Sequence, residues 1–546
     1  IAGTLTLDGL TVAGNVSVDS GTIKLDGNYP TGVNNVALGN AAFDSVTTGD
    51  QNVAIGASAL TATTDGRNNT AIGEEALAAS TSDNNNTAVG KQSMTATDGG
   101  TLNAAFGSDT MKANTTGDNN LAVGAQALFS NTTASNNTAV GYQAGYSNTT
   151  GTENNALGYK ALYTNTTANQ NNAFGRTALF ANTTGSHNSA FGHSSLKTNT
   201  TGQYNTAHGS QALFSNTTAS NNTAVGYQAG YSNTTGTANA TVGKDSLRAN
   251  TTGSNMAVLG DSAAYNNTSG TDAVAIGAGS LYANTTGNYN VAVGREALNQ
   301  NTTASDNTAV GYQSLYANTT GVRNVAVGST TGNSLTGGTE NVVVGQQALK
   351  TDTNGQRSVA IGFYSLANQN HTGAGTNAYN VAVGALSMQG NTTGMFNVGI
   401  GGQALGNNTT ANNNTAVGYQ SLYTNTTGGQ NTAVGYLAGY YNTTGVSLSV
   451  FGRQAGYSNT TGTDNSFFGR NSGFSTTTGN YNTGIGRSAL AQNTTASNNT
   501  AVGRQALTSN TTASNNTAVG YRSGYNNITG VSNTFLGKDA GFSSTA

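Results

Sequence analysis

The sequence predicts an all-β protein, a parallel β-solenoid or β-roll of about thirty 17-residue coils. Three observations predict this fold. A 17-residue pattern repeats over most of the 546 residues, only 8% of the residues are charged, and a short apolar segment precedes a glycine in every repeat. A period of 17 is too short for helix-pair repeats of roughly 33–34 residues, and it suits one coil of a solenoid.

The repeat is defined by the glycine that follows each apolar segment, called here the anchor glycine. Anchors stand at Gly39, Gly56 and every 17 residues up to Gly362, and one step of 22 residues then leads to Gly384. Steps of 17 continue to Gly537, which makes thirty anchors and one five-residue insertion. Residues 126–152 and 211–237, five periods apart, are identical. Such duplication at a fixed period is typical of solenoids.

The segment before each anchor is predicted to be a strand. Alternate strand residues face opposite sides, so Thr138 and Val140 would face one side and Ala139 the other. The residue before the anchor is Val, Ile, Leu or Phe in nearly every coil and is expected in the core, where His208 would be a variant core residue. The nearly constant alanine at the position of Ala139 suggests that another subunit approaches closely there.

The rest of the coil is predicted to contain a second strand and a turn. The second short strand is expected over residues 143–146. The sequence NTTG that follows is typical of a turn, in which Gly151 is free to take a positive φ.

The repeats divide the chain into four segments. Residues 1–33 alternate apolar and polar residues between glycines and are predicted to be a β-rich leader, with Pro30, the only proline, at the junction. The solenoid is predicted over residues 34–365 and 381–546, and residues 366–380 form an insertion loop between them. Loops on a rigid scaffold often carry function, although a harmless insertion has the same appearance.

The composition argues against several classes of protein. The chain has no cysteine, which excludes disulfides and thiolate metal sites. Its formal net charge is −3, so no basic excess indicates nucleic acid. No apolar run approaches the ~20 residues of a membrane helix. The chain begins at Ile1 without a signal-peptide pattern, and we expect it to be processed or trimmed.

Catalysis is not expected. The four histidines, at positions 187, 193, 208 and 371, lack the spacing of metal ligands, and Asp and Glu are scattered without a unique pair. Asp65, Asp83 and Asp98 lie in early turns and could bind Ca²⁺, but the glycine-rich pattern of calcium solenoids is absent. The sequence therefore predicts a protein that is not an enzyme and that has no cofactor, no metal site and no catalytic residue.

An asparagine stands four residues before the anchor in 26 of the thirty coils. Stacked Asn side chains form hydrogen-bonded ladders along a solenoid, so a structural ladder is predicted here, with a repeated ligand surface as the alternative. The predicted ladder includes Asn137, Asn154, Asn171, Asn188, Asn205 and Asn222.

The sequence NTT occurs at the turn in 19 coils, and each occurrence is also an N-x-T glycosylation sequon. We interpret it first as turn chemistry. Glycosylation of a secreted protein is one alternative, and binding of ordered water by a threonine ladder, as in ice-binding solenoids, is another. The candidate glycosylation sites are Asn131, Asn148 and Asn216.

The residue after the anchor is Tyr in seven coils and Arg or Lys in nine. Where four consecutive coils carry arginine, stacking would place like charges about 5 Å apart, which is costly unless an anion, a carboxylate or solvent relieves it. One interpretation is a basic strip for an anionic glycan, and the other is a solvated row. The strip consists of Arg453, Arg470, Arg487 and Arg504. Tyrosines at the same position are expected to stack on sugars or to cover the edge of the solenoid: Tyr142, Tyr227 and Tyr312.

The segments NNVALG, NVAIG and NVAVG resemble head repeats of trimeric autotransporter adhesins, where a similar strand opens each coil. In that family each subunit is a left-handed parallel β-roll and three subunits pack about one axis. The resemblance implies a homotrimeric fibre. The family's period is shorter, and the NTT turn supplies the additional residues here.

The combination of TAVGYQ with NTTG, and the leader LTLDGLTVAGNVSV, are similar to tail-fibre proteins of marine and cyanobacterial phages. This resemblance implies the structural shaft of a viral tail fibre, part of the virion, holding a host-receptor-binding tip that lies outside this chain. Its implied partners are further copies of itself, other fibre or baseplate proteins and host surface glycans, without nucleic acid or membrane insertion. The alternative is a cell-surface adhesin or extracellular-matrix filament, glycosylated at the NTT turns. An ice-binding solenoid is a weaker alternative.

Overall fold

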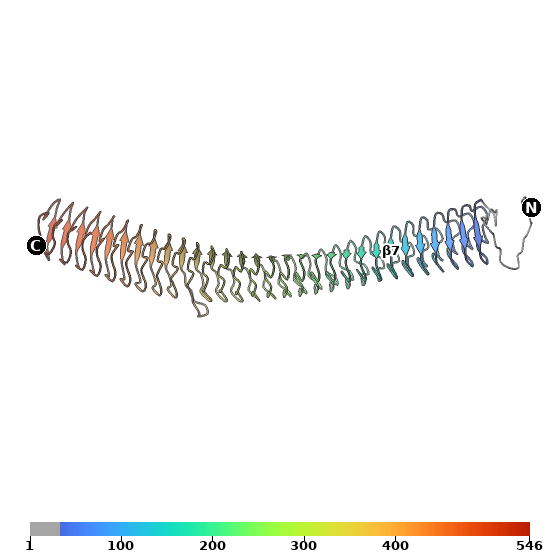
Figure 1. The fold of residues 1–546 in the computed structure, drawn as a ribbon, viewed down its shortest axis with the longest axis horizontal. Helices are drawn as coiled ribbons and strands as arrows, with labels where there is room; N and C mark the ends of the chain where they lie inside the picture. Colours follow the sequence, from blue (N-terminus) through green and yellow to red (C-terminus); the bar gives the residue numbers. More distant parts are fainter. Residues whose placement is uncertain (1–32, 546) are drawn as a thin grey trace, which may run out of the picture. The chain divides into compact units, whose positions relative to one another are not determined.

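The computed structural model describes residues 33–545, which form parallel β-solenoid coils (Figure 1). Chain contacts divide them into two units, one ending at Asn188 and the other beginning at Ser189. The predicted leader lies outside the described residues except for Val33. Within residues 33–545 there is no helix long and apolar enough to cross a membrane. The all-β solenoid prediction is confirmed for each unit.

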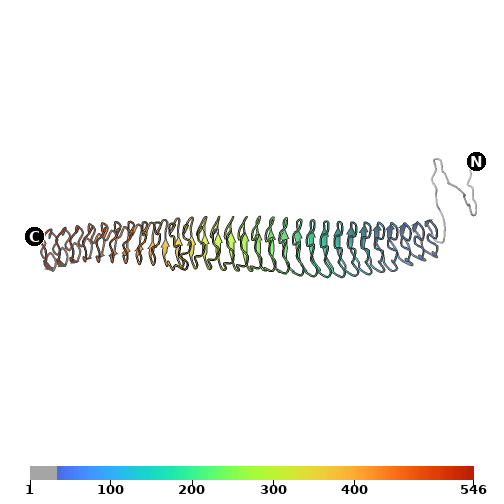
Figure 2. The ribbon, with the colours of Figure 1, turned by 90° about the horizontal axis from the view of Figure 1, so that it is seen from below.

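The first unit contains nine strands of three residues, visible as a row of arrows in Figures 1 and 2. At the usual strand spacing, β1 to β9 span about 40 Å. The strands are β1 (Val36–Leu38), β2 (Val53–Ile55), β3 (Thr70–Ile72), β4 (Thr87–Val89), β5 (Ala104–Phe106), β6 (Leu121–Val123), β7 (Thr138–Val140), β8 (Asn155–Leu157) and β9 (Asn172–Phe174).

The second unit contains 21 strands of the same length, spanning about 100 Å by the same spacing. They are β10 (Ser189–Phe191), β11 (Thr206–His208), β12 (Thr223–Val225), β13 (Ala240–Val242), β14 (Ala257–Leu259), β15 (Val274–Ile276), β16 (Val291–Val293), β17 (Thr308–Val310), β18 (Val325–Val327), β19 (Val342–Val344), β20 (Val359–Ile361), β21 (Val381–Val383), β22 (Val398–Ile400), β23 (Thr415–Val417), β24 (Thr432–Val434), β25 (Ser449–Phe451), β26 (Ser466–Phe468), β27 (Thr483–Ile485), β28 (Thr500–Val502), β29 (Thr517–Val519) and β30 (Thr534–Leu536).

Within each unit, every strand pairs in parallel with the strand of the next coil. Ala139 of β7 faces Ala156 of β8, and Ala292 of β16 faces Ala309 of β17. Across the 22-residue step the register is kept, since Ala360 of β20 faces Ala382 of β21. The five additional residues are therefore accommodated outside the sheet.

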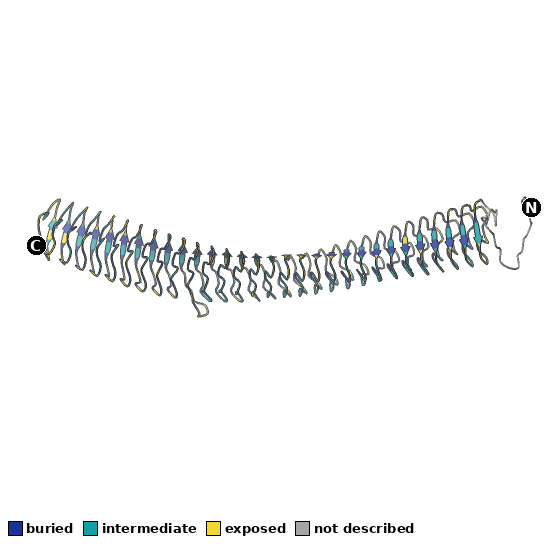
Figure 3. Cartoon of the chain, in the orientation of Figure 1, coloured by how far each residue is buried: buried dark blue, intermediate teal, exposed yellow. Residues whose placement is uncertain are grey.

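The strand places its alanine inside the coil and its larger residues outside, opposite to the expectation for Val140. Ala139 is fully buried, whereas Thr138 and Val140 lie half-buried on the outer side. Figure 3 shows buried and intermediate residues side by side along the strands. The small size of Ala139 thus follows from packing inside its own coil and gives no indication of a second subunit. His208 is likewise exposed and not a core residue; its ring meets Phe191 edge-on at 4.5 Å.

The predicted second strand over residues 143–146 is wrong, because this segment turns. Gln143 and Gly145 both have left-handed backbones, with φ of 54° and 60°. In the next coil Leu162 takes the same conformation as Gly145, with φ of 50°, and its N–H donates to the carbonyl of Ala178 at 3.0 Å. Bonds of this kind join successive coils outside the strands and offset the cost of the left-handed residues.

Two glycines are required for different reasons. The anchor Gly141 has φ of 137°, and a Cβ there would lie 2.5 Å from the carbonyl oxygen of Gly158. Gly151, for which the turn predicts a positive φ, does not have one. Its constraint is space instead, because an added Cβ would lie 2.3 Å from the carbonyl oxygen of Ala168.

Small and medium side chains fill the interior. In the second unit one continuous buried cluster runs from Leu247 to Ala518 and consists mainly of Ala and Leu, with Phe467 as its largest member. Leucines four residues after the anchor, such as Leu298, reach into the coil opposite the strand alanines. Because alanine buries little apolar surface, the coils also depend on buried hydrogen bonds.

Candidate functional site

The asparagines four residues before the anchor fasten each coil to the next. In the first unit Asn137 Oδ1 accepts the backbone N–H of Asn154 at 2.9 Å, and Asn154 Nδ2 donates to the carbonyl of Ala168 at 2.8 Å. In the second unit Asn205 Oδ1 accepts the N–H of Asn222 at 3.0 Å. The six predicted members, which also include Asn171 and Asn188, are all buried. Buried amides present no ligand surface, so their contacts are structural.

The NTT asparagines form a second buried row, which the sequence pattern did not predict. Asn148 Nδ2 donates to Asn131 Oδ1 at 3.0 Å and to the carbonyl of Gly151 at 2.9 Å. In the second unit Asn216 Nδ2 donates to the carbonyl of Ala219 at 3.0 Å. A glycan on any of these nitrogens would break such bonds, so the folded coil favours the turn interpretation. The constant spacing of NTT was the signal that could have revealed this row.

The first threonine of most NTT turns also forms a hydrogen bond with the neighbouring coil. Thr149 Oγ1 donates to the carbonyl of Thr166 at 3.0 Å, whereas Thr150 is exposed. The same bond recurs in the second unit between Thr217 and Thr234, at 3.1 Å. In these turns one hydroxyl of the threonine pair is therefore directed to the neighbouring coil and is not available to order water.

The residues after the anchors form a row along each unit that is exposed in most coils. Arg453, Arg470, Arg487 and Arg504 follow strands β25 to β28 in four consecutive coils, and all four are exposed. Tyr436 and Tyr521 flank them. The guanidinium of Arg453 lies 5.8 Å from the ring centre of Tyr436, and that of Arg504 lies 5.7 Å from the ring centre of Tyr521.

The tyrosines of this row present mainly ring edges where they stack. Tyr142 lies 5.6 Å from Tyr159 at an interplanar angle of 19°, so the neighbouring ring covers one of its faces. Tyr227 and Tyr312 are nearly half exposed. A flat platform for sugars requires an open ring face, which a stack offers only at its ends.

A second aromatic row lies five residues after the anchor. Tyr440 stacks between Tyr423 and Tyr457 with ring centres 5.4 and 5.5 Å apart, and Phe474 continues the stack at 5.0 Å. Burial in the stack raises the pKa of Tyr440. Burial also raises the pKa of Tyr457, with a further contribution from its hydrogen bond to Tyr441.

The outer strand face carries an apolar stripe. We define this stripe as the residues one and three positions before each anchor, and it is widest from β15 to β22. There valine or isoleucine occupies both positions in most strands, and Val325, Val327 and Val342 are each 38% exposed. Contiguous apolar surface of this kind marks interaction surfaces.

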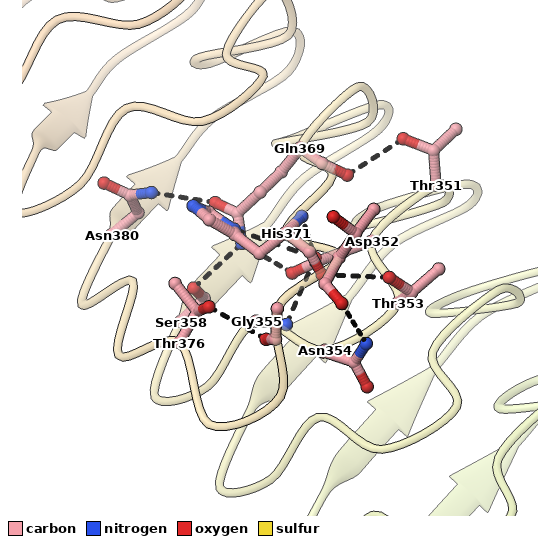
Figure 4. Close-up of polar contacts among 12 residues, drawn as sticks. Thr351, Asp352, Thr353, Asn354, Gly355, Ser358, Gln369, His371, Thr376 and Asn380 are labelled. Carbon is pink, nitrogen blue, oxygen red and sulfur yellow. Dashed lines mark hydrogen bonds and ion pairs between the residues drawn. The ribbon is translucent and has the colours of Figure 1, made fainter.

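The insertion contains a buried polar cluster (Figure 4). Asp352 and Gln369 replace NTT asparagines, and Asp352 is fully buried. Its carboxylate accepts N–H groups from Gly355 at 3.2 Å and His371 at 2.9 Å, and Gln369 Nε2 at 2.7 Å. Asn380 Nδ2 donates to Gln369 Oε1 at 2.8 Å. The side chain of Gln369, which is longer than that of asparagine, thus links the NTT row to the asparagine row four residues before the anchors.

His371, the only buried histidine in the described range, lies beside this carboxylate. Its Nδ1 is 3.7 Å from Asp352 Oδ1, and neither ring nitrogen has a hydrogen-bond partner among residues 33–545. One histidine and one carboxylate are too few to hold a metal ion.

Surface charges fasten the insertion loop. Arg357 donates to Glu340 Oε2 at 2.6 Å, to Asn377 Oδ1 at 2.7 Å and to the hydroxyl of Tyr379 at 2.8 Å. Glu340 also accepts a hydrogen bond from Arg323 at 2.6 Å. Hydrogen bonds from Arg357 and then Arg323 lower the pKa of Glu340.

The early acidic turns do not converge on a cation site. No group of three or more His, Asp or Glu residues arranged to hold a metal occurs in the described part of the chain. Asp65 and Asp98 are exposed, whereas Asp83 is buried and its Oδ1 accepts the N–H of Gly99 at 2.5 Å. Burial raises the pKa of Asp83, and its Oδ2 has no partner among the described residues.

No family model matches the chain, and a comparison with curated proteins finds no matching sequence. The coil and its outer surfaces are therefore the features that indicate a function.

Proposed function

We propose that this chain is the structural shaft of a viral tail fibre that holds a host-receptor-binding tip away from the virion. The observation that supports it most is the repetition of the same buried bonds in successive coils of each unit. Asn137 and Asn154 are joined in one unit by the bond that joins Asn205 and Asn222 in the other. Repetition of one element adds length without creating a unique reaction site.

The proposed shaft is a homotrimer whose copies meet through the apolar stripe. The stripe repeats at the strand spacing of about 4.8 Å. A second copy of this chain carries the same stripe at the same spacing, so two copies in register bring apolar residues together in nearly every coil. The partner that fits best is therefore another copy, and cyclic symmetry closes the assembly. The number three comes from the resemblance to trimeric adhesin heads.

The proposed location is the virion, with baseplate or other fibre proteins at the ends and host surface glycans as further partners. Cryo-electron imaging of the native source tests this directly. Three chains in cross-section, rooted in a virion, are expected. Filaments rooted in a cell or lying free in a matrix would overturn the proposal and favour an adhesin or matrix filament.

A further inference from the structure

The four consecutive arginines differ from the other cations of their row. Lys244 lies 3.4 Å from Asp245, Arg295 lies 3.4 Å from Glu296, and Lys538 lies 3.8 Å from Asp539. In the first unit Lys91 lies 2.9 Å from Glu74. Four of the five other cations at this coil position thus have a carboxylate of their own.

The four arginines of the strip have no carboxylate partner of this kind. None of Arg453, Arg470, Arg487 and Arg504 forms an ion pair with any residue of the described range 33–545. The residues that follow them, where Lys244 and Arg295 have their acidic partners, are Gln454, Asn471, Ser488 and Gln505. Four like charges therefore stand in line at about 4.8 Å intervals, and their repulsion is reduced only by solvent and salt.

A second copy of the chain does not supply the missing carboxylates. Between Asp352 and Asp539 the only acidic residue is Asp464. Copies that pack in register place equivalent coils side by side. Each copy therefore contributes only one carboxylate, that of Asp464, for its four arginines. An anionic partner for each arginine can therefore come only from a different molecule.

We propose that this arginine strip binds a linear polysaccharide that carries carboxylate or sulfate groups at intervals close to the strand spacing. A regular row of guanidinium groups fits a polymer whose anionic groups recur at a similar interval, because each group then meets its own donor. The ligand would lie along β25 to β28, between Tyr436 and Tyr521.

The flanking tyrosines favour a polysaccharide over a single-stranded nucleic acid. Recognition of single strands uses open aromatic faces on which bases stack. Tyr521 has Arg504 at 5.7 Å and Arg522 at 5.1 Å from its ring centre, and Tyr436 lies between Arg453 and the stacked ring of Tyr419. These faces are occupied. The chain's net charge of −3 is also unlike that of nucleic-acid-binding proteins.

The test measures binding of the full chain to polygalacturonate and to heparin, with dextran as the uncharged polymer. We expect the two anionic polymers to bind, more weakly as salt increases, and dextran not to bind. The double variant R470Q/R487Q is expected to bind about tenfold more weakly, the combined effect of losing two exposed ion pairs. The matched control R295Q removes an exposed arginine at the same coil position that already has Glu296.

Three results would overturn the proposal. They are an absence of binding to both anionic polymers, equal binding by R470Q/R487Q and the unaltered chain, and an equal loss in R295Q. Tighter binding of a single-stranded oligonucleotide of matched charge would assign the strip to nucleic acid instead. The outcome is independent of the proposed shaft function, because it does not depend on where the protein is attached.

Discussion

Asn148 donates its side-chain N–H to Oδ1 of Asn131 in the preceding coil, at 3.0 Å, with both side chains buried. The same Oδ1–Nδ2 contact continues from Asn148 to Asn165 at 2.9 Å. Each amide thus bonds to the coil before it and the coil after it. In a protein whose core is largely alanine, this row supplies part of the cohesion that larger apolar side chains supply elsewhere.

Asn148→Ala is expected to loosen the coils on both sides. The substitution leaves Asn131 Oδ1 and Asn165 Nδ2 without a side-chain partner, at a cost of about 1–3 kcal/mol. Hydrogen exchange should therefore be faster in the coils around Gly141 and Gly158 than in distant coils of the same unit. Thr150→Ala, which removes an exposed hydroxyl from the same turn, is the control. Equal exchange in the two variants would contradict a structural role for the row.

Asp83→Ala is expected to stabilise the first unit at neutral pH. Burial raises the folded-state pKa of Asp83 above its ordinary value of 3.8, so folding favours the protonated form. Its contribution is most favourable below pH 3.8 and is lost as the pH rises through the folded-state pKa. Alanine, the residue at the equivalent Ala134, removes the unpaired Oδ2 and should raise stability by about 1 kcal/mol.

The measurement for Asp83 is the thermal midpoint at pH 3 and pH 7. The gain from Asp83→Ala should be larger at pH 7 and should shrink at pH 3. The exposed Gly99 N–H, which loses its acceptor, can bond to water. Asp65→Ala serves as the control at an exposed turn, and a gain for Asp83→Ala that does not vary with pH would contradict the burial argument.

V325D/V327D is expected to separate the proposed trimer into monomers. Both side chains lie on the outer face of β18, and two carboxylates there would be buried without partners in an interface. Sedimentation equilibrium should give about three times the chain mass of 54.7 kDa for the unaltered protein and a single chain for the variant. T320D alters an exposed turn residue of the preceding coil and should remain assembled. Unchanged circular dichroism would show that the coil itself is intact, and a variant that still forms trimers would exclude this face as the interface.

The tyrosine stack of the second unit is expected to lose stability in alkali. Since the pKa values of Tyr440 and Tyr457 are raised above the ordinary value of 10.0, folding favours the neutral phenols. This contribution is full below pH 10 and is lost as the pH rises through the folded-state pKa values. Y440F/Y457F, which introduces the residue type of Phe474 in the same stack, should reduce the alkaline decrease in thermal midpoint. An identical decrease in both proteins would assign it to other groups.

Asp352→Asn is expected to destabilise the insertion although it restores the usual residue of the row. The amide has one acceptor oxygen in place of two and cannot accept from Gly355, His371 and Gln369 together. Leaving one of these buried donors unpaired costs about 1–3 kcal/mol. Limited proteolysis should cut residues 366–380 faster in this variant than in Asp464→Asn, which removes an exposed charge. Equal cleavage would show that the cluster does not hold the loop.

The period of 17 residues and the position of the anchor glycines were sufficient to predict a parallel β-solenoid. Stacked coils of equal length require a constant number of residues between equivalent positions. The period and the anchors also placed the asparagine row four residues before each anchor, but not the buried row of NTT asparagines. Local expectations failed at Val140 and His208, at residues 143–146 and at Gly151. A pattern such as Thr-Ala-Val has an apolar residue on each face of the strand, so alternation alone does not distinguish inside from outside.

The space available inside the folded coil decided which strand residues lie inside and which lie outside. Leucines such as Leu162, held by a left-handed backbone, fill the space opposite the strand, and the middle strand residue that faces this space is usually alanine. The valines are therefore placed outside, where they form the apolar stripe. The sequence by itself determined the repeat, the fold class and the alignment of the arginines after β25 to β28. Only the folded chain showed that these arginines have no carboxylate, because ion pairing depends on distances between coils that spacing along the chain does not specify.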